Sequence, residues 1–236
     1  MSTIALIGPD GAGKTTISRM LQESGLLPFK YLYMGVNISA SNVALPSARF
    51  AEYVKRRLGI GEPMSAGAPP RARAGAARRR GPIRRLWSAA RLGNRLADAW
   101  FRQLVSWSYE LRGYVVLYDR HFALDFAHEV AADASDSYDR RLYRWCLTHL
   151  YPSPDVVIFL DAPGAVLYAR KGESTVEELE RRRQAFLSQG QRLPCFRRVD
   201  ATRPLPEVFA EVSSHVVGLC RSRRSTPTEP SELARP

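Results

Sequence analysis

Cysteine is scarce in this chain of 236 residues. The three cysteines, Cys146, Cys195 and Cys220, are widely spaced, and no two of them form a C-x-x-C pair. An odd number of isolated cysteines argues against a disulfide framework or a zinc site and favours reduced thiols. No apolar run approaches the roughly 18–20 residues of a membrane span, and the first predicted strand starts so early that we expect no signal peptide. We therefore predict a cytoplasmic protein.

Lysine is also rare, and one long segment has no acid at all. Only 4 of the 35 basic residues are lysines, and residues 63–97 hold nine arginines without any Asp or Glu. This segment accounts for most of the net charge of +12. The rest of the chain is close to balanced, as we expect of an enzyme that acts on small molecules.

The arginine-rich segment allows three interpretations. In the first, residues 71–95 contact the phosphates of a nucleic acid. In the second, the following helix would lie on a membrane surface, because six apolar residues fall near one face: Leu86, Trp87, Leu96, Trp100, Leu104 and Trp107. We favour the third, in which these Trp and Leu side chains pack on a sheet, the arginines are solvated, and the excess of arginine over lysine is partly a compositional bias.

The strongest motif is a glycine-rich loop in IALIGPDGAGKTT, residues 4–16. It fills the pattern G-x-x-x-x-G-K-[ST], with an apolar run suited to a buried strand before it and apolar residues at helical spacing after it. Backbone N–H groups of such a loop turn inward around phosphates, and the positive end of the next helix dipole adds to the attraction. The motif predicts a nucleoside triphosphate site formed by Gly8, Asp10, Gly11, Ala12, Gly13, Lys14, Thr15 and Thr16.

A second candidate site follows another apolar run, in VVLYDRH at residues 115–121. We expect Asp119 at the carboxyl edge of the sheet, where it can hold Mg²⁺ together with the Thr15 hydroxyl or act as a base toward an acceptor. Arg120 offers a planar fork for an anionic acceptor, while Lys14 reaches the outer phosphates of the donor. The alternative for Asp119 and Arg120 is an ordinary surface ion pair, which we find less favoured beside the glycine-rich loop.

A third candidate region spans residues 159–186, where a strand ends in Asp161 and the next helix carries Arg170 and Lys171 beside a polar turn. Phosphoryl transfer spreads negative charge over the transferring group, so a short lid with basic residues at its base can supply the catalytic cation. We assign that role to Arg170 or Lys171. The three arginines at 181–183 we interpret as a solvated helix face with i,i+4 ion pairs.

Strands and helices alternate along the chain, which predicts an α/β protein of the P-loop NTPase fold with a five-stranded parallel sheet flanked by helices. We expect strands at about 3–8, 30–34, 114–119, 155–161 and 195–200. Helices are expected at about 14–24, 40–58, 83–112, 137–149, 163–171, 175–189 and 205–221. We predict one domain, residues 1–222, with a disordered basic insertion at 62–82 and a disordered tail at 223–236.

Taken in order, the motifs resemble those of thymidylate kinases, a branch of the nucleoside monophosphate kinases: GPDGAGKTT, YDRH, FLD with ARKGE, and RVDAT. The resemblance covers residues 3–22 and 110–215 and is weak between about 25 and 109. It implies a five-stranded parallel sheet wrapped by helices and transfer of a phosphate from ATP·Mg²⁺ to dTMP.

The resemblance also implies roles for single residues. Asp10 would lie near the acceptor sugar, and Asp119 with Arg120 would lie at the acceptor phosphate and the metal. Some members of the family carry an arginine where this chain has Gly11, and others supply a catalytic arginine from the lid. With a glycine there, the chain resembles the second kind, which again indicates Arg170 or its neighbour Lys171.

The segment after Arg120 departs from the family. The pattern D-R-Y-x-x-S-x-x-A-Y-Q reads DRHFALDFAHE here, so that His121 and His128 each replace a tyrosine. The arginine-bearing helix motif that reads the thymine base is also missing. Because a site loses discrimination when it loses its hydrogen-bonding partners, dTMP specificity is implied only weakly. We expect a small anionic acceptor bound by Asp10, Arg120 and His128.

Two other functions stay open on the sequence. One is a P-loop kinase of another metabolite, such as a sugar or nucleoside in a glycan or specialised pathway. The other is a regulatory NTPase that binds nucleic acid or membrane through its arginine-rich arm. The sequence also leaves open whether the chain forms a homodimer.

Overall fold

The computed structural model describes residues 2–35, 42–43, 45–46, 53, 57, 82–121, 138–172, 174–191, 193 and 195–224. Several predictions made from the sequence lie outside these residues. They are the basic insertion at 62–82 except Pro82, most of the helix at about 40–58, the tail from residue 225 onward, and His128.

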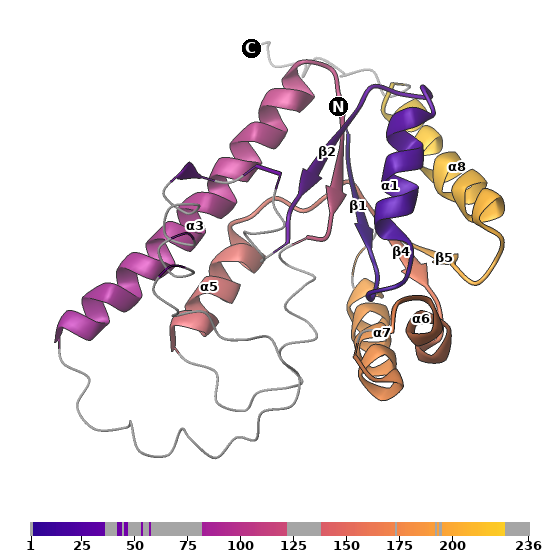
Figure 1. Ribbon diagram of the computed structural model, residues 1–236. Coiled ribbons are helices and arrows are strands. Elements are labelled where there is room, and N and C mark those ends of the chain that lie inside the picture. The colour runs from indigo at the N-terminus through magenta and orange to yellow at the C-terminus, as the bar shows by residue number, and fades with distance from the viewer. Residues whose placement is uncertain are drawn as a thin grey trace, which may run out of the picture.

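The described residues form an α/β fold around a five-stranded parallel sheet with the order β2-β3-β1-β4-β5 (Figure 1). This confirms the predicted sheet, and each strand end lies within one residue of its predicted place. The strands are β1 (Thr3–Ile7), β2 (Phe29–Tyr33), β3 (Val115–Asp119), β4 (Val156–Asp161) and β5 (Phe196–Asp200). Every residue of β1, β3 and β4 is buried, which explains why these central strands are near-continuous apolar runs.

Helices cover both faces of the sheet because successive side chains of a strand point to opposite sides. In β1, Ile4 and Leu6 face the layer of α1 (Lys14–Glu23) and α8 (Leu205–Arg224), while Ala5 and Ile7 face α3 (Pro82–Leu111) and α5 (Tyr138–His149). Figure 1 shows α3 and α5 on one side of the sheet and α1 and α8 on the other.

Two further helices form a hairpin near the carboxyl end of β4. They are α6 (Gly164–Lys171) and α7 (Val176–Gly190), and they lie at the lower right in Figure 1. Gly164 permits their close approach, since a Cβ on this residue would lie 2.6 Å from the carbonyl oxygen of Val176. The hairpin brings the basic end of α6 toward the loop that follows β1.

The strand order places a switch point between β1 and β3. The chain leaves β1 toward β2 on one side and leaves β3 toward β4 on the other side. In open parallel sheets, ligands bind at the carboxyl ends of the strands beside such a point. The two carboxyl ends here are Ile7, which enters the glycine-rich loop, and Asp119.

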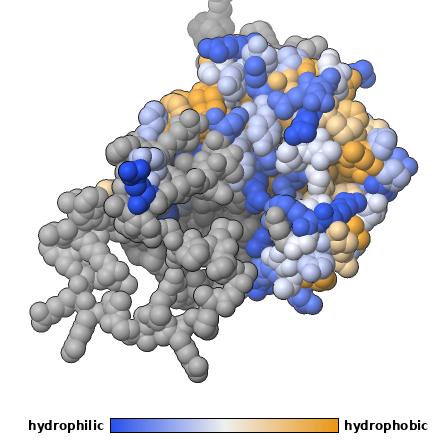
Figure 2. Space-filling model, in the orientation of Figure 1, coloured by the Kyte–Doolittle hydropathy of each residue, from blue (hydrophilic) through white to orange (hydrophobic). Residues whose placement is uncertain are grey.

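Helix α3 divides its apolar residues between the core and the surface. Ala99 is buried, and Leu92 and Leu96 pack against the same core cluster. Four large apolar side chains of this helix are exposed: Trp100, Leu104, Trp107 and Leu111. Figure 2 shows hydrophobic surface over the part of α3 that lies toward the top of Figure 1. The single apolar face predicted from the sequence is therefore split, since Leu96 packs in the core and Leu104 does not.

In the described part of the chain, no helix combines the length and the apolar character needed to cross a membrane.

Candidate functional site

The glycine-rich loop, residues 8–13, joins β1 to α1, and Gly13 is the N-cap of that helix. Gly11 has a φ of +88°, and a Cβ on this residue would lie 2.7 Å from the carbonyl oxygen of Leu167 in α6. Glycine therefore lets the loop lie directly against α6. Any other side chain at this position would meet the same carbonyl oxygen.

Substitution of Gly11 by alanine is expected to lower the free energy of unfolding by about 1–3 kcal/mol, because a non-glycine residue is strained at this φ. The Cβ would also press on Leu167. Gly93 is a matched control: it lies in α3, and a Cβ there meets nothing within 4 Å. Gly93→Ala is expected to raise the stability by about 0.5–1 kcal/mol through the better helix propensity of alanine. Chemical denaturation of both variants tests this prediction. If Gly11→Ala is as stable as the unaltered protein, the tight contact between the loop and α6 is contradicted.

Lys14 is buried beneath the glycine-rich loop. Its Nζ donates hydrogen bonds to the carbonyl oxygens of Gly8, at 2.7 Å, and Pro9, at 2.8 Å. The ammonium group therefore lies inside the loop. Oxygens of an anion bound in the loop can accept the same hydrogen bonds, with the advantage of opposite charge.

Asp119 is buried at the end of β3, with its two carboxylate oxygens in different surroundings. Oδ2 accepts a hydrogen bond from the Tyr31 hydroxyl at 2.7 Å. Burial and this carboxylate raise the pKa of Tyr31 above its usual value, so its hydroxyl stays protonated and donates. Oδ1 is buried and has no hydrogen-bond partner within the described ranges. A buried carboxylate oxygen of this kind suits a metal ion or a water molecule as a partner.

Arg120 follows directly and has a φ of +65°, which is unusual for a residue other than glycine. Such a conformation costs of order 1–3 kcal/mol and is found most often at ligand sites. The Arg120 Nη2 donates to Oδ1 of Asp10 in the glycine-rich loop at 2.7 Å. The end of β3 is thus connected to the loop after β1 across the switch point.

The Asp10 carboxylate lies between two guanidinium groups. Arg120 bonds one oxygen, and Arg182 of α7 donates from Nη1 to the other, at 3.3 Å. Burial by itself would raise the pKa of Asp10, but the positive charges of Lys14, Arg120, Lys171 and Arg182 outweigh this effect, and the pKa is lowered. Asp10 is therefore ionised at neutral pH.

The predicted lid residues lie at the end of α6, which stops at Gly172. The Arg170 Nη2 donates to the carbonyl oxygen of Ala201, at 2.9 Å, just after β5. Arg170 and Lys171 both line the same pocket as the glycine-rich loop. The basic end of α6 is thus turned toward the site, as its proposed role requires.

These elements enclose a pocket of about 560 Å³ at the switch point. Its lining consists of Asp10, Gly11, Gly13, Lys14, Thr15, Thr16, Tyr31, Tyr33, Asp119, Arg120, Arg170 and Lys171. The structure therefore brings together most of the residues that the sequence singled out. Gly8 and Ala12 do not line this pocket, and His128 lies outside the described residues.

A smaller hollow of about 270 Å³ lies on the other side of the glycine-rich loop. Gly11, Gly13, Thr16 and Arg170 line both spaces, so the two are adjacent. The smaller one is completed by Ala12, Ile17, Ala201, Arg203, Leu205 and Val208. This hollow could not be predicted from the sequence, because only the packing of the segment after β5 brings its far wall, Ala201, Arg203, Leu205 and Val208, to the glycine-rich loop.

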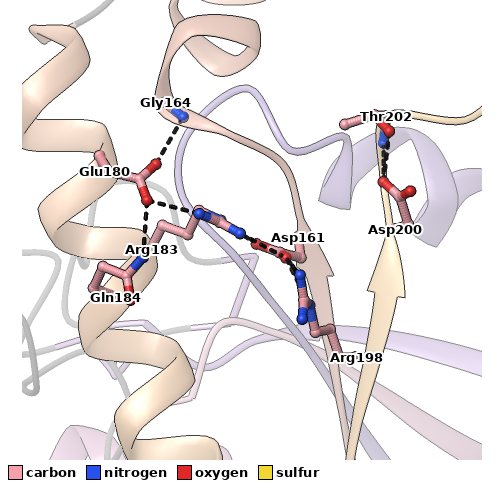
Figure 3. A network of polar contacts seen from close by, with 8 residues as sticks. All are labelled: Asp161, Gly164, Glu180, Arg183, Gln184, Arg198, Asp200 and Thr202. Carbon is pink, nitrogen blue, oxygen red and sulfur yellow. Dashed lines mark hydrogen bonds and ion pairs between the residues drawn. The ribbon is translucent and has the colours of Figure 1, made fainter.

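The carboxylate of Asp161 belongs to a buried ion-pair network rather than to the pocket (Figure 3). It accepts hydrogen bonds from Nε and Nη2 of Arg183 at 2.5 and 3.2 Å, and from Nε of Arg198 at 2.7 Å. Arg183 also donates to Glu180, which in turn accepts from the backbone N–H of Gly164. The network fastens α7 to β4 and to the start of α6.

The three arginines at 181–183 differ in their surroundings. Arg181 bonds only Glu178 among the contacts found for it, and this pair is exposed, in agreement with the solvated face expected from the sequence. That expectation is wrong for Arg183, which binds the buried Asp161, and incomplete for Arg182, which reaches Asp10. Glu178 and Arg182 form a local pair at the expected i,i+4 spacing. This spacing gave no indication of the second contact, from Arg182 to Asp10.

His121 lies in the core rather than in the pocket. It is buried, its ring lies 5.9 Å from that of Tyr118 and 6.0 Å from that of Tyr151, and burial lowers its pKa to about 4. The imidazole is therefore neutral at physiological pH. His121 is not among the residues that line the pocket.

Mg²⁺ would be held by the hydroxyl of Thr15 and the carboxylate of Asp119. Both residues line the pocket, and the Oδ1 atom of Asp119 suits a hard cation. No cluster of three or more His, Cys, Asp or Glu side chains that could hold a metal occurs among the described residues.

Comparison with known proteins yields no matching family model and no significant match among curated proteins.

Proposed function

We propose that the protein is an ATP-dependent phosphotransferase of the P-loop NTPase fold, which resembles thymidylate kinase and moves the γ-phosphate of ATP to a nucleoside monophosphate such as dTMP. The observation that carries the proposal is the single pocket in which the glycine-rich loop faces Asp119 and Arg120 on one side and Arg170 and Lys171 on the other. A donor loop, an acidic residue, an acceptor arginine and basic residues near the transfer path are the parts that phosphoryl transfer requires.

On the donor side, the backbone of the glycine-rich loop and Lys14 bind the phosphates of ATP. The adjacent hollow offers the guanidinium groups of Arg170 and Arg203 together with apolar side chains, a combination that suits a purine ring. A bound Mg²⁺ would supply positive charge that offsets the negative charge of the phosphates. Thr15 and Asp119 would orient it.

On the acceptor side, Arg120 binds the anionic group and Asp119 orients the accepting oxygen. Tyr31 holds Asp119 in place through its hydrogen bond to Oδ2. Arg170 and Lys171 offer positive charge to the transferring group, whose transition state carries more dispersed negative charge than its ground state. All of these groups line one pocket, which supports the proposal because electrostatic stabilisation is most effective when its donors are held in place before the reaction.

An acceptor screen tests the proposal. With Mg·ATP, release of ADP is expected to depend on the acceptor in a panel of nucleoside monophosphates, nucleosides and sugar phosphates, and to be lost when Mg²⁺ is removed. Turnover with another acceptor but not with dTMP would exclude dTMP as the substrate and would still support phosphotransferase activity. ATP hydrolysis that no small acceptor changes, but that DNA, RNA or anionic vesicles stimulate, would replace the proposal by the regulatory NTPase.

A further inference from the structure

Arg182 spans the space between α7 and the glycine-rich loop. Its Nε donates to Glu178 one turn earlier, at 3.0 Å, and its Nη1 donates to Asp10 at 3.3 Å. The bond to Glu178 holds the stem of the side chain against its own helix. The other end of the guanidinium is thereby directed at the loop, and the residue is only partly exposed.

Arg182 and Arg120 bind the Asp10 carboxylate from two sides. Arg120 comes from the end of β3 and Arg182 from α7, and each bonds a different oxygen of the same carboxylate. A guanidinium group has five N–H donors in a planar fork. Asp10 therefore brings two such forks together on one carboxylate.

The charges around Asp10 favour a second anion. Four cationic side chains act on this one carboxylate strongly enough to lower its pKa despite burial: Lys14, Arg120, Lys171 and Arg182. Asp119 is the other acid that lines the pocket. Glu178, which pairs with Arg182, is a third acid near this end of the pocket. Among the described residues the four cations still outnumber these three carboxylates, and the excess is reduced when an anion binds.

We propose that Arg182 and Arg120 form a clamp for the anionic group of the phosphate acceptor, and that Asp10 holds the two guanidinium groups in position for it. The ligand class is a phosphate monoester, because its three terminal oxygens can accept from two planar forks at once. This inference rests on the proposed function, since it concerns the acceptor end of the pocket. Asp10 and Arg120 line that end, and Arg182 reaches it through its bond to Asp10 without being part of the lining. It makes Arg182 a determinant of specificity for phosphorylated over unphosphorylated acceptors.

The neighbouring arginine provides a matched control for the test. Arg181 and Arg182 lie side by side on α7 and both pair with Glu178, but only Arg182 reaches Asp10. Arg182→Gln, Arg182→Lys and Arg181→Gln are compared with the unaltered protein. Each is first saturated with Mg²⁺ and the β,γ-methylene analogue of ATP to fill the donor site, and inorganic phosphate is then titrated by calorimetry.

Arg182→Gln is expected to weaken phosphate binding by about 10-fold or more, the usual effect of losing a hydrogen bond to a charged group. Arg182→Lys should be intermediate, because it keeps the charge and loses the fork. Arg181→Gln should match the unaltered protein. The Kd for the ATP analogue and the thermal midpoint should be the same in all four proteins, which separates a binding role from a structural one.

The inference is overturned if Arg182→Gln binds phosphate as tightly as Arg181→Gln, or if the unaltered protein binds no phosphate with the analogue in place. Failure of the proposed function has a different signature, because the unaltered protein would then not bind the ATP analogue at all. In that event phosphate is titrated into the protein without the analogue, and the difference between the Arg182 and Arg181 variants still decides whether the clamp exists.

Discussion

Replacement of Lys14 by methionine is expected to lower kcat/KM for ATP-dependent phosphotransfer by about 10²- to 10³-fold, the usual effect of removing one preorganised donor from a transition-state site. Lys14 is the cation that lies inside the glycine-rich loop, where its Nζ bonds the carbonyl oxygens of Gly8 and Pro9. Methionine has a similar length and no charge. The loop therefore keeps its packing, but it loses the positively charged hydrogen-bond donor that would stabilise the phosphates in the transition state.

Lys30→Met is the matched control for this experiment. Lys30 belongs to β2, and its ammonium group lies 4.9 Å from the ring of Tyr114, so it takes no part in the pocket. Its substitution should leave kcat/KM within about twofold, because surface substitutions away from a site usually have small effects. Thermal melting of both variants shows whether either is unfolded. Equal activity in a folded Lys14→Met protein would remove the glycine-rich loop from the proposed reaction.

Substitution of Asp161 by asparagine is expected to reduce the free energy of unfolding by about 3 kcal/mol, near the lower end of the range for breaking one partner out of a buried ion pair. The carboxylate bonds Arg183 and Arg198 (Figure 3). Arg198 is half exposed and can be solvated by water, whereas Arg183 is mostly buried and loses the partner of its Nε and Nη2 atoms. The main penalty therefore falls on Arg183.

Asp200 is the control for Asp161, because the two residues are paired in register on β5 and β4. Asp200 is exposed and bonds only Thr202 two residues later among its side-chain contacts in the described structure. Asp200→Asn should change stability by no more than about 0.5–1 kcal/mol. Urea denaturation, read at constant m-value, distinguishes the two variants. Similar midpoints for both would mean that the ion pair at α7 contributes nothing net to the fold.

The strands could be predicted from the sequence because the central ones are buried on both faces and appear as apolar runs that end in a charged residue. Asp119 and Asp161 both mark such an end. The full strand order could not be predicted, because the three central runs are similarly apolar and their pairing depends on which helix covers which face. The motifs predicted that the site lies at the carboxyl edge of the sheet. They did not predict all the residues that form the walls of the pocket.

The parts of the site that sequence reasoning missed all depend on contacts between elements. Arg182 has a partner four residues earlier in the sequence, Glu178, and this local ion pair gives no hint of a second contact. Only the packing of α7 near the glycine-rich loop brings Arg182 to Asp10. The contact of Gly11 with Leu167 likewise needs α6 to lie on the loop. The hydrogen bond of Tyr31 to Asp119 in the same way depends on the pairing of β2 with β3.

The run of arginines on α7 has a consequence for insertions and deletions. Successive residues of a helix are rotated by about 100° around its axis, so the three guanidinium groups point to the surface, to the glycine-rich loop and to the end of β4. Adding or removing one residue between the buried Leu179 and Arg181 would turn the arginines by one such step relative to the packed face of the helix, although the composition would be almost unchanged. The spacing between that packed face and the arginines is therefore as much a part of the site as the arginines themselves.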